Sequence, residues 1–188
     1  MLAATMTADP SRAAPRRNIE LKSGCGDLAA ARDAALRLGA ADAGVLEQTD
    51  TYFHCKSGRL KLRETVGRRA ELIAYDRPDH ADVRASDYDL ISIDDPATLK
   101  RGLARTLGVR VVVVKRRELL MWYNVRIHLD RVEGLGSFVE FEAVISEGED
   151  EATGHERVAM LAEALRLRDE DRIATSYSNL IEAARRAV

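Results

Sequence analysis

Polar and apolar side chains alternate along much of the chain between residues 18 and 145, the pattern of strands whose two faces meet different surroundings. Runs rich in Val, Ile, Tyr and Phe, often bounded by Gly, Pro or Asp, predict about eight strands. We expect these strands at residues 18–23, 45–53, 59–65, 70–77, 88–93, 109–117, 120–130 and 137–145.

Helical patterns fall between and after these strands. Asp27 can cap a helix over residues 28–38, which Gly39 ends. Three more helices are expected over residues 97–107, 151–167 and 177–187, and the last could plug one mouth of the fold or pack outside it. Long runs of strand with a few interspersed helices predict an α+β fold built on an antiparallel sheet.

Several strands carry charged side chains on one face and aliphatic ones on the other. The polar faces are Asn18, Glu20 and Lys22; Arg59, Lys61 and Arg63; Lys115 and Arg117; Asn124, Arg126, His128 and Asp130; and Glu140 and Glu142. The apolar faces, including Val112 and Val114, are expected to be covered by the helices. For a single strand, a solvated polar face is the simpler interpretation, because such alternation is common on half-exposed sheets. Across the whole set, it favours an eight-stranded antiparallel β-barrel with a charged interior and helices packed outside.

A charged interior implies a ligand of matching chemistry. Clustered Lys and Arg repel one another unless a polyanion lies between them, and both side chains suit phosphate oxygens. Paired carboxylates repel likewise unless divalent cations bridge them, and Mg²⁺ and Mn²⁺ prefer oxygen ligands. The pattern therefore predicts a metal–polyphosphate ligand.

Composition narrows the class of protein. The 188 residues suit one domain, which we place at residues 15–188 behind a disordered tail over residues 1–14. A formal net charge of −2 argues against a general nucleic-acid binder. No apolar run approaches the length of a membrane-spanning helix. Cys25 and Cys55 are expected to be free thiols in the cytoplasm. The oligomeric state stays open, with a homodimer as one alternative.

The chain opens its strands with the segment NIELK, in which Glu20 and Lys22 alternate with aliphatic residues. The segments QTDTYF, GRLKLRE, ELIAYDRP, VKRREL, NVRIHLD, LGSFVEFE and SYSNLI follow in that order. Their order and spacing resemble the CYTH domain of the triphosphate tunnel metalloenzyme superfamily, and most closely its class IV adenylyl cyclase-like branch. The resemblance covers roughly residues 18–181, and NIELK is similar to the family's E-x-E-x-K, with Asn18 in place of the first Glu.

The resemblance implies an eight-stranded tunnel, a small-molecule triphosphate and a requirement for Mg²⁺ or Mn²⁺. It implies that Glu20, Glu140 and Glu142 are metal ligands. It also implies that the triphosphate contacts are Lys22, Lys61, Arg63, Arg77, Lys115, Arg117 and Arg126. Glu20 and Lys22 would be catalytic, with Lys22 either binding phosphate or acting as a base. Asn18 could weaken one metal site, because an amide oxygen brings no charge.

Three functions are compatible with such a tunnel. The first is a class IV adenylyl cyclase-like enzyme that converts ATP to cyclic AMP and pyrophosphate. The second is a triphosphatase that hydrolyses inorganic tripolyphosphate, thiamine triphosphate or a nucleotide. The third is a protein that binds a nucleotide or polyphosphate without turnover.

Overall fold

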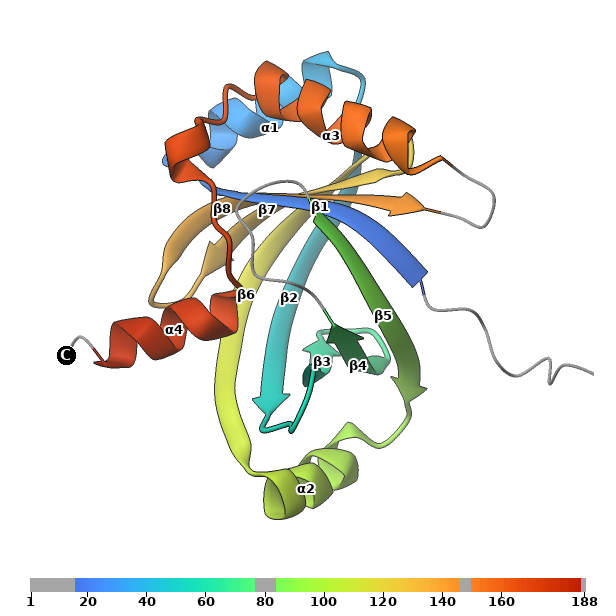
Figure 1. Ribbon diagram of the computed structural model, residues 1–188, viewed down its shortest axis with the longest axis vertical. Helices are drawn as coiled ribbons and strands as arrows, with labels where there is room; N and C mark the ends of the chain where they lie inside the picture. The colour runs from blue at the N-terminus through green and yellow to red at the C-terminus, as the bar shows by residue number, and fades with distance from the viewer. Residues whose placement is uncertain (1–15, 77–83, 146–149, 187–188) are drawn as a thin grey trace, which may run out of the picture.

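The computed structural model describes residues 16–76, 84–145 and 150–186 (Figure 1). The strands are β1 (Arg16–Gly24), β2 (Ala41–Phe53), β3 (Arg59–Thr65), β4 (Ala70–Asp76), β5 (Arg84–Ile93), β6 (Val109–Trp122), β7 (Val125–Val132) and β8 (Gly136–Ile145). The helices are α1 (Leu28–Arg37), α2 (Pro96–Leu107), α3 (Glu151–Ala164) and α4 (Tyr177–Arg186), with one 3₁₀ turn at Asp169–Asp171. The α+β class is confirmed. The expected tail over residues 1–14 lies outside the described residues.

The eight strands close into a barrel in the order β1-β5-β4-β3-β2-β6-β7-β8, and β8 pairs back onto β1. Every pairing is antiparallel. Because side chains alternate along a strand, each strand gives one face to the interior and one to the outside. The predicted barrel with a charged interior is therefore confirmed.

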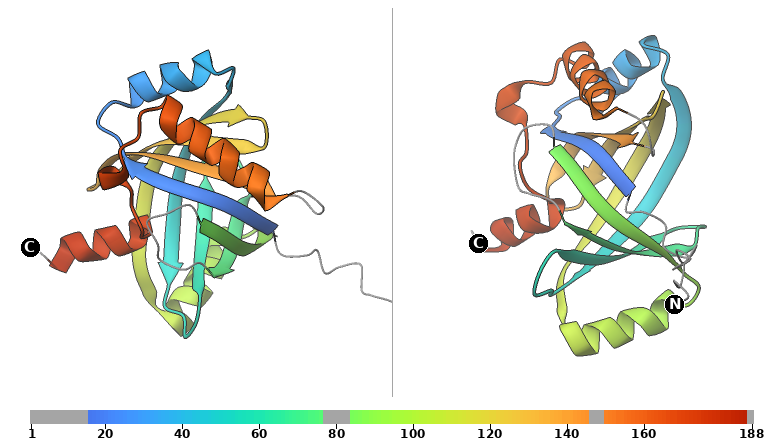
Figure 2. Two further views of the ribbon diagram at one scale, coloured as in Figure 1. Left: turned by 45° about the horizontal axis from the view of Figure 1, so that its top comes forward. Right: turned by 45° about the vertical axis from the view of Figure 1, so that its right-hand side comes forward.

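Helices α1 and α3 lie together over the outer face of β1, β7 and β8 (Figures 1 and 2). Ile19 and Phe141 on the strands are fully buried against Leu161 of α3. The approach is close at Gly154, where a Cβ atom would lie 2.8 Å from Ile145 Cδ1. This is the apolar core that the aliphatic faces of the strands predict.

Helix α2 covers a smaller apolar cluster at the far end of β2 and β3 (Figure 1). Its Leu99 and Leu103 pack against Phe53 and Leu62, which are both buried. Asp95 caps the helix by accepting a hydrogen bond from the Thr98 amide.

Helix α4 packs against β6, and its first residue enters the barrel. Tyr177 is buried with Val111, Val113 and Phe138, whose side chains face inward. Outside, Arg110 of β6 binds both carboxylate oxygens of Glu182. The C-terminal segment therefore fills one part of the barrel interior and is also held from the outside.

Two expectations about β6 are wrong. The strand runs on to Trp122, and a two-residue turn, Tyr123–Asn124, joins it to β7, where the sequence suggested a break near residue 118. Tyr123 takes a positive φ of 49° without a glycine to signal the turn. Val112 and Val114 do face outward, but the helices in the described part of the chain leave Val112 37% exposed and Val114 half-buried.

Two further expectations concern membranes and thiols. None of the helices in the described ranges has both the length and the apolar character needed to cross a bilayer. Cys25 is half-buried and Cys55 is exposed, and both are free thiols.

Candidate functional site

A cavity of about 520 Å³ occupies the barrel interior, and all eight strands contribute side chains to it. Eight of the lining residues are Lys or Arg and five are Asp or Glu, so the cavity is positively charged although the chain as a whole is not. Arg68 and Arg69 are exposed, and the other six cations are buried or half-buried. A positive excess around a cavity attracts polyanions.

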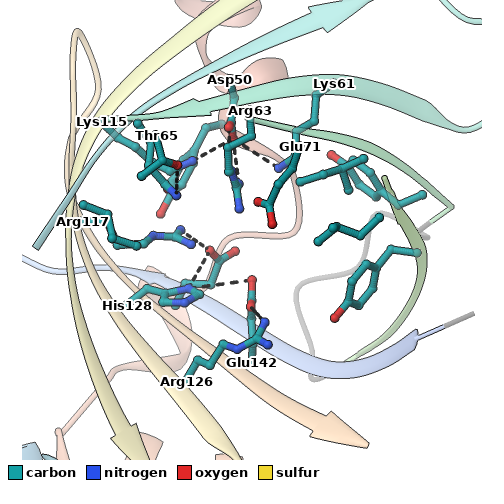
Figure 3. Close-up of a pocket in the computed structure, with 18 of the residues that line it drawn as sticks. Asp50, Lys61, Arg63, Thr65, Glu71, Lys115, Arg117, Arg126, His128 and Glu142 are labelled. Carbon is teal, nitrogen blue, oxygen red and sulfur yellow. Dashed lines mark hydrogen bonds and ion pairs between the residues drawn. The ribbon is translucent and has the colours of Figure 1, made fainter. Parts of the chain in front are cut away.

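On one side of the cavity, three cations surround one carboxylate; we call Asp50, Lys61, Arg63 and Lys115 the cationic cluster (Figure 3). Asp50 is only 1% exposed. Arg63 donates to both its oxygens at 2.8 and 2.9 Å. Lys115 Nζ lies 2.8 Å and Lys61 Nζ 3.2 Å from Asp50 Oδ2. The strands β2, β3 and β6 are neighbours in the barrel, which brings these residues together.

The cationic cluster has more positive than negative charge, and its pKa values reflect this. Burial alone would raise the pKa of Asp50, but Arg63, Lys115 and Lys61 hold it well below its usual range. Burial lowers the pKa of Lys115 to about 7, with repulsion from Arg63 and Arg117 adding to the effect and Asp50 opposing it. The cluster can therefore accept further negative charge.

On the facing side of the cavity lie His128 of β7 and Glu142 of β8 (Figure 3). Together with Glu140 of β8 they form a group that we call the acidic cluster. His128 Nδ1 lies 3.6 Å from Glu140 Oε2 and 3.8 Å from Glu142 Oε1. Glu140 also pairs with Lys22 Nζ at 2.8 Å, and Glu142 lies 3.5 Å from Arg126 Nη1. The β7–β8 register sets His128 opposite Glu140 and Arg126 opposite Glu142.

The acidic cluster has the donor chemistry of a divalent metal site. Potential ligand atoms of His128, Glu140 and Glu142 all lie within 4.8 Å of one another. The Nδ1 atom of His128 is buried and has no hydrogen-bond partner among the described residues. Burial would raise the pKa values of both carboxyl groups, but His128, Arg117 and, for Glu140, Lys22 lower them, so both are ionised. Carboxylate oxygens with an imidazole nitrogen fit Mn²⁺ well and Mg²⁺ through the oxygens.

Arg117 joins the acidic cluster to Asp130, a further buried carboxylate. It donates to both oxygens of Asp130, at 2.7 and 2.6 Å, and to Glu140 Oε2 at 2.8 Å. Tyr177 donates to Asp130 Oδ2 at 2.8 Å, and Lys22 Nζ lies 4.0 Å from the centre of its ring. Tyr177, the first residue of α4, thus contacts side chains at the base of the cavity and holds them in place.

The structure brings nearly all the predicted site residues into this cavity. Glu20, Lys22, Lys61, Arg63, Lys115, Arg117, Arg126, Glu140 and Glu142 all line it. Glu20 pairs across the strands with Glu142, but it lies outside the compact group of three potential ligands. Arg77 falls outside the described residues, and its predicted contact with the triphosphate stays a prediction.

Sequence reasoning missed three residues of the site. Asp50 stands in QTDTYF, where the strand's alternation could have placed it inside, but a single acid among Thr and Tyr gives a weak signal. His128 stands on a polar strand face, but its position beside two carboxylates depends on the pairing of β7 with β8. Tyr177 reaches the site from the C-terminal helix, and no periodicity predicts that contact.

Known proteins share this architecture. The PH1012 protein from Pyrococcus horikoshii is 26% identical over 87% of this chain and 98% of its own, with a TM-score of 0.77. A candidate adenylate cyclase from Vibrio parahaemolyticus is 20% identical over 88% and 97%, with a TM-score of 0.73. HpAC1 from Hippeastrum, described as having a dominant triphosphatase activity, is 12% identical over 90% and 96%, with a TM-score of 0.63. No curated protein matches the chain.

The family assignment rests on the sequence as well as the fold. The model of the CYTH domain matches residues 16–177, which include every strand and the Tyr177 that closes the site. CYTH proteins bind triphosphate substrates and depend on metal. The chain therefore belongs to the CYTH domain family.

Proposed function

We propose that this protein is a metal-dependent enzyme that binds a triphosphate in the barrel cavity and cleaves one of its phosphoanhydride bonds. The observation that carries the proposal is the pairing of two clusters across one cavity. The cationic cluster holds three cations around a single carboxylate. The acidic cluster holds two ionised carboxylates beside an imidazole whose Nδ1 has no hydrogen-bond partner among the described residues.

The cationic cluster would bind the phosphate chain. Asp50 holds Lys61, Arg63 and Lys115 in place before the ligand arrives, which reduces the ordering that binding requires. Arg63 offers a planar fork and the two lysines offer compact charges, and both suit phosphate oxygens. Asp50 neutralises only one of the three cations, and a bound polyanion would neutralise the other two.

The acidic cluster would hold Mg²⁺ or Mn²⁺ through Glu142, Glu140 and His128, with Glu20 beside them. Such an ion stabilises the charge that develops on the phosphate oxygens and on the leaving group. Arg126 and Lys22 flank the carboxylates and face the same cavity, so they can contact the phosphates next to the ion. The ion pair between Lys22 and Glu140 favours phosphate contact over proton abstraction as the role of Lys22.

Two nucleophiles fit the same site. Attack by the ribose 3′-hydroxyl of ATP on the α-phosphorus gives cyclic AMP and pyrophosphate, the class IV cyclase-like reaction. Attack by water on the terminal phosphorus breaks the last phosphoanhydride bond and gives orthophosphate with the remaining diphosphate, which is ADP from ATP or pyrophosphate from tripolyphosphate; this is the triphosphatase reaction. The Vibrio structure is described as a candidate cyclase and the Hippeastrum structure as chiefly a triphosphatase, so relatives support both.

Product analysis tests the proposal. The purified protein is incubated with ATP or with tripolyphosphate, in Mg²⁺ or in Mn²⁺, and the products are resolved by chromatography with mass detection. We expect metal-dependent product that Glu142→Gln removes and that Glu47→Gln, on the exposed side of β2, leaves unchanged. Cyclic AMP with pyrophosphate identifies a cyclase, and orthophosphate identifies a triphosphatase. Binding without any product in either metal would contradict the enzymatic proposal and favour a binding protein.

A further inference from the structure

The carboxylate of Glu71 lies in the cavity but belongs to neither cluster. Glu71 is the second residue of β4, and its half-buried side chain points into the cavity (Figure 3). Asp50, Glu140 and Glu142 each pair with at least one Lys or Arg. Glu71 has no ion pair or hydrogen bond with any residue that the structure describes. Charge balance within the cavity therefore does not explain why an acidic residue stands at this position.

Glu71 stands beside the cationic cluster. In the pairing of β3 with β4 it lies directly opposite Arg63, and both side chains face the cavity. Side chains directly opposite each other on paired strands are close neighbours. Arg63 nevertheless donates its hydrogen bonds from Nε and Nη2 to Asp50. A phosphate group in contact with Arg63 would therefore have the carboxylate of Glu71 at its side.

A carboxylate next to a phosphate group needs a hydrogen-bond donor between the two, because like charges at short distance repel each other. A water molecule is such a donor. It can donate a hydrogen bond to the carboxylate and direct an oxygen lone pair toward the phosphorus atom. This is the arrangement of a nucleophilic water and the general base that takes up its proton.

Water can reach Glu71 from outside the barrel. Arg68 and Arg69, in the turn just before β4, are exposed and line the same cavity, so this turn borders an opening of the cavity. Through that opening water can enter, and a proton taken up by Glu71 can return to solvent. Lys22, the other candidate base, is only 3% exposed and is paired with Glu140. Access therefore favours Glu71 as the group that exchanges protons with solvent.

We infer that Glu71 is the general base of a triphosphatase reaction in this cavity. The inference rests on the proposed function and adds to it the group that takes up the proton of the nucleophile. Glu71 accepts one proton from the water while the water oxygen forms its bond to the terminal phosphorus. The bond from that phosphorus to the bridging oxygen breaks, and its electron pair stays with the leaving diphosphate. The proton on Glu71 then passes to solvent, which restores the carboxylate.

The test separates turnover from binding in the variant Glu71→Gln, which keeps the size of the side chain but cannot take up the proton. The matched control is Glu64→Gln on β3, because Glu64 is also half-buried but pairs with Lys100 of α2 outside this cavity. Turnover is measured as orthophosphate released from tripolyphosphate in Mn²⁺. Calorimetry in EDTA measures tripolyphosphate binding, and electron paramagnetic resonance measures Mn²⁺ affinity.

We expect Glu71→Gln to lower the turnover number by about a hundredfold or more, the usual contribution of a general base. Tripolyphosphate binding should be equal or tighter, because a like charge is removed from the cavity. Mn²⁺ affinity should stay within about twofold, whereas loss of a metal contact costs at least about tenfold. Formate should restore part of the turnover lost in Glu71→Ala, because it supplies a small carboxylate. Glu64→Gln should match the wild type throughout.

Several results would overturn the inference and leave the proposed function standing. They are turnover of Glu71→Gln within about twofold of the wild type, and cyclic AMP as the sole product from ATP. A parallel fall in Mn²⁺ affinity would make Glu71 a metal ligand instead, and lost turnover that formate does not restore would assign it a structural role. If the wild-type protein cleaves neither ATP nor tripolyphosphate, the proposed function itself fails.

Discussion

The cationic and acidic clusters face each other across one cavity, but they balance their charges differently. In the cationic cluster, one carboxylate faces three cations, all within 3.2 Å. In the acidic cluster, Glu140 and Glu142 face the two cations Lys22 and Arg126, with Arg117 shared with Asp130, and an imidazole lies between the carboxylates. The cationic cluster has a net positive charge, and the acidic cluster is nearly neutral.

This difference separates two kinds of ligand within one barrel. Spare positive charge attracts phosphate oxygens, whereas ionised carboxylates and a nitrogen lone pair can ligate a cation. Charge balance decides which ligand each side favours, since both sides contain Lys or Arg together with Asp or Glu. The predictions below test this division, from the largest expected effect to the smallest.

The largest effect is expected from Asp50→Asn, which leaves Lys61, Arg63 and Lys115 without their shared carboxylate. We expect a loss of about 3–5 kcal/mol in the free energy of unfolding, the range for breaking a buried ion pair. Urea denaturation measures the loss. Saturating tripolyphosphate should stabilise the variant more than the wild type, because the ligand replaces the missing charge.

The matched control for that variant is Asp42→Asn, which removes an ion pair with Arg32 from the exposed start of β2. We expect no measurable change in stability there. If Asp50→Asn were as stable as the wild type, the three cations of the cationic cluster would need no negative partner. That result would contradict the difference in charge balance between the two clusters.

Next in size is Glu142→Gln, which removes charge from the acidic cluster and leaves the cationic cluster untouched. We expect the turnover number to fall by at least about a hundredfold, because the site loses a metal ligand. Binding of tripolyphosphate in EDTA should change little. Electron paramagnetic resonance of Mn²⁺ measures the metal affinity directly, and an unchanged affinity would exclude Glu142 as a ligand.

The variant Lys115→Met should weaken tripolyphosphate binding about tenfold at pH 6.5, because it removes one charged donor. The groups facing Lys115 are Asp50, Lys61, Arg63, Arg117 and the Tyr177 ring. Since the pKa of Lys115 in the free protein is about 7, its side chain is mostly neutral at pH 8. A bound polyanion favours the charged form and raises that pKa, so binding at pH 8 takes up a proton and weakens as the pH rises above 7.

Calorimetry in two buffers of different ionisation enthalpy measures this uptake. We expect the wild type to take up as much as about one more proton than Lys115→Met at pH 8. The same linkage acts on folding: the unfolded chain binds more protons between pH 7 and about 10.5, so this residue makes stability rise with pH over that range. Equal proton uptake by the two proteins would assign the titration to another group.

The smallest effect is expected from Tyr177→Phe, at the point where the clusters meet. The variant keeps the ring over Lys22 and loses one hydrogen bond to Asp130, which Arg117 still satisfies twice. We expect a loss of about 1 kcal/mol in unfolding free energy. Thermal melting measures the loss, with Tyr123→Phe, on an exposed turn, as the control. A large fall in metal affinity would instead place Tyr177 within the acidic cluster.

Most of the correct predictions about the fold and the site came from the alternation of charged and aliphatic residues along the strands. It assigned Glu20, Lys22, Lys61 and Arg63 to inward faces because charged and aliphatic residues strictly alternate there. It could not show which cations share a carboxylate, because the position of Asp50 opposite both β3 and β6 depends on pairings between distant strands. The contact of Tyr177 with Asp130 likewise joins segments 47 residues apart, and no local pattern records it.

The most direct test of the central claim is a crystal structure of the protein with Mn²⁺ and tripolyphosphate, with manganese located by its anomalous scattering. We expect manganese bound by His128, Glu140 and Glu142, and phosphates in contact with Lys61, Arg63 and Lys115. Manganese elsewhere, or a triphosphate bound outside the barrel, would contradict the division of the cavity into a phosphate side and a metal side.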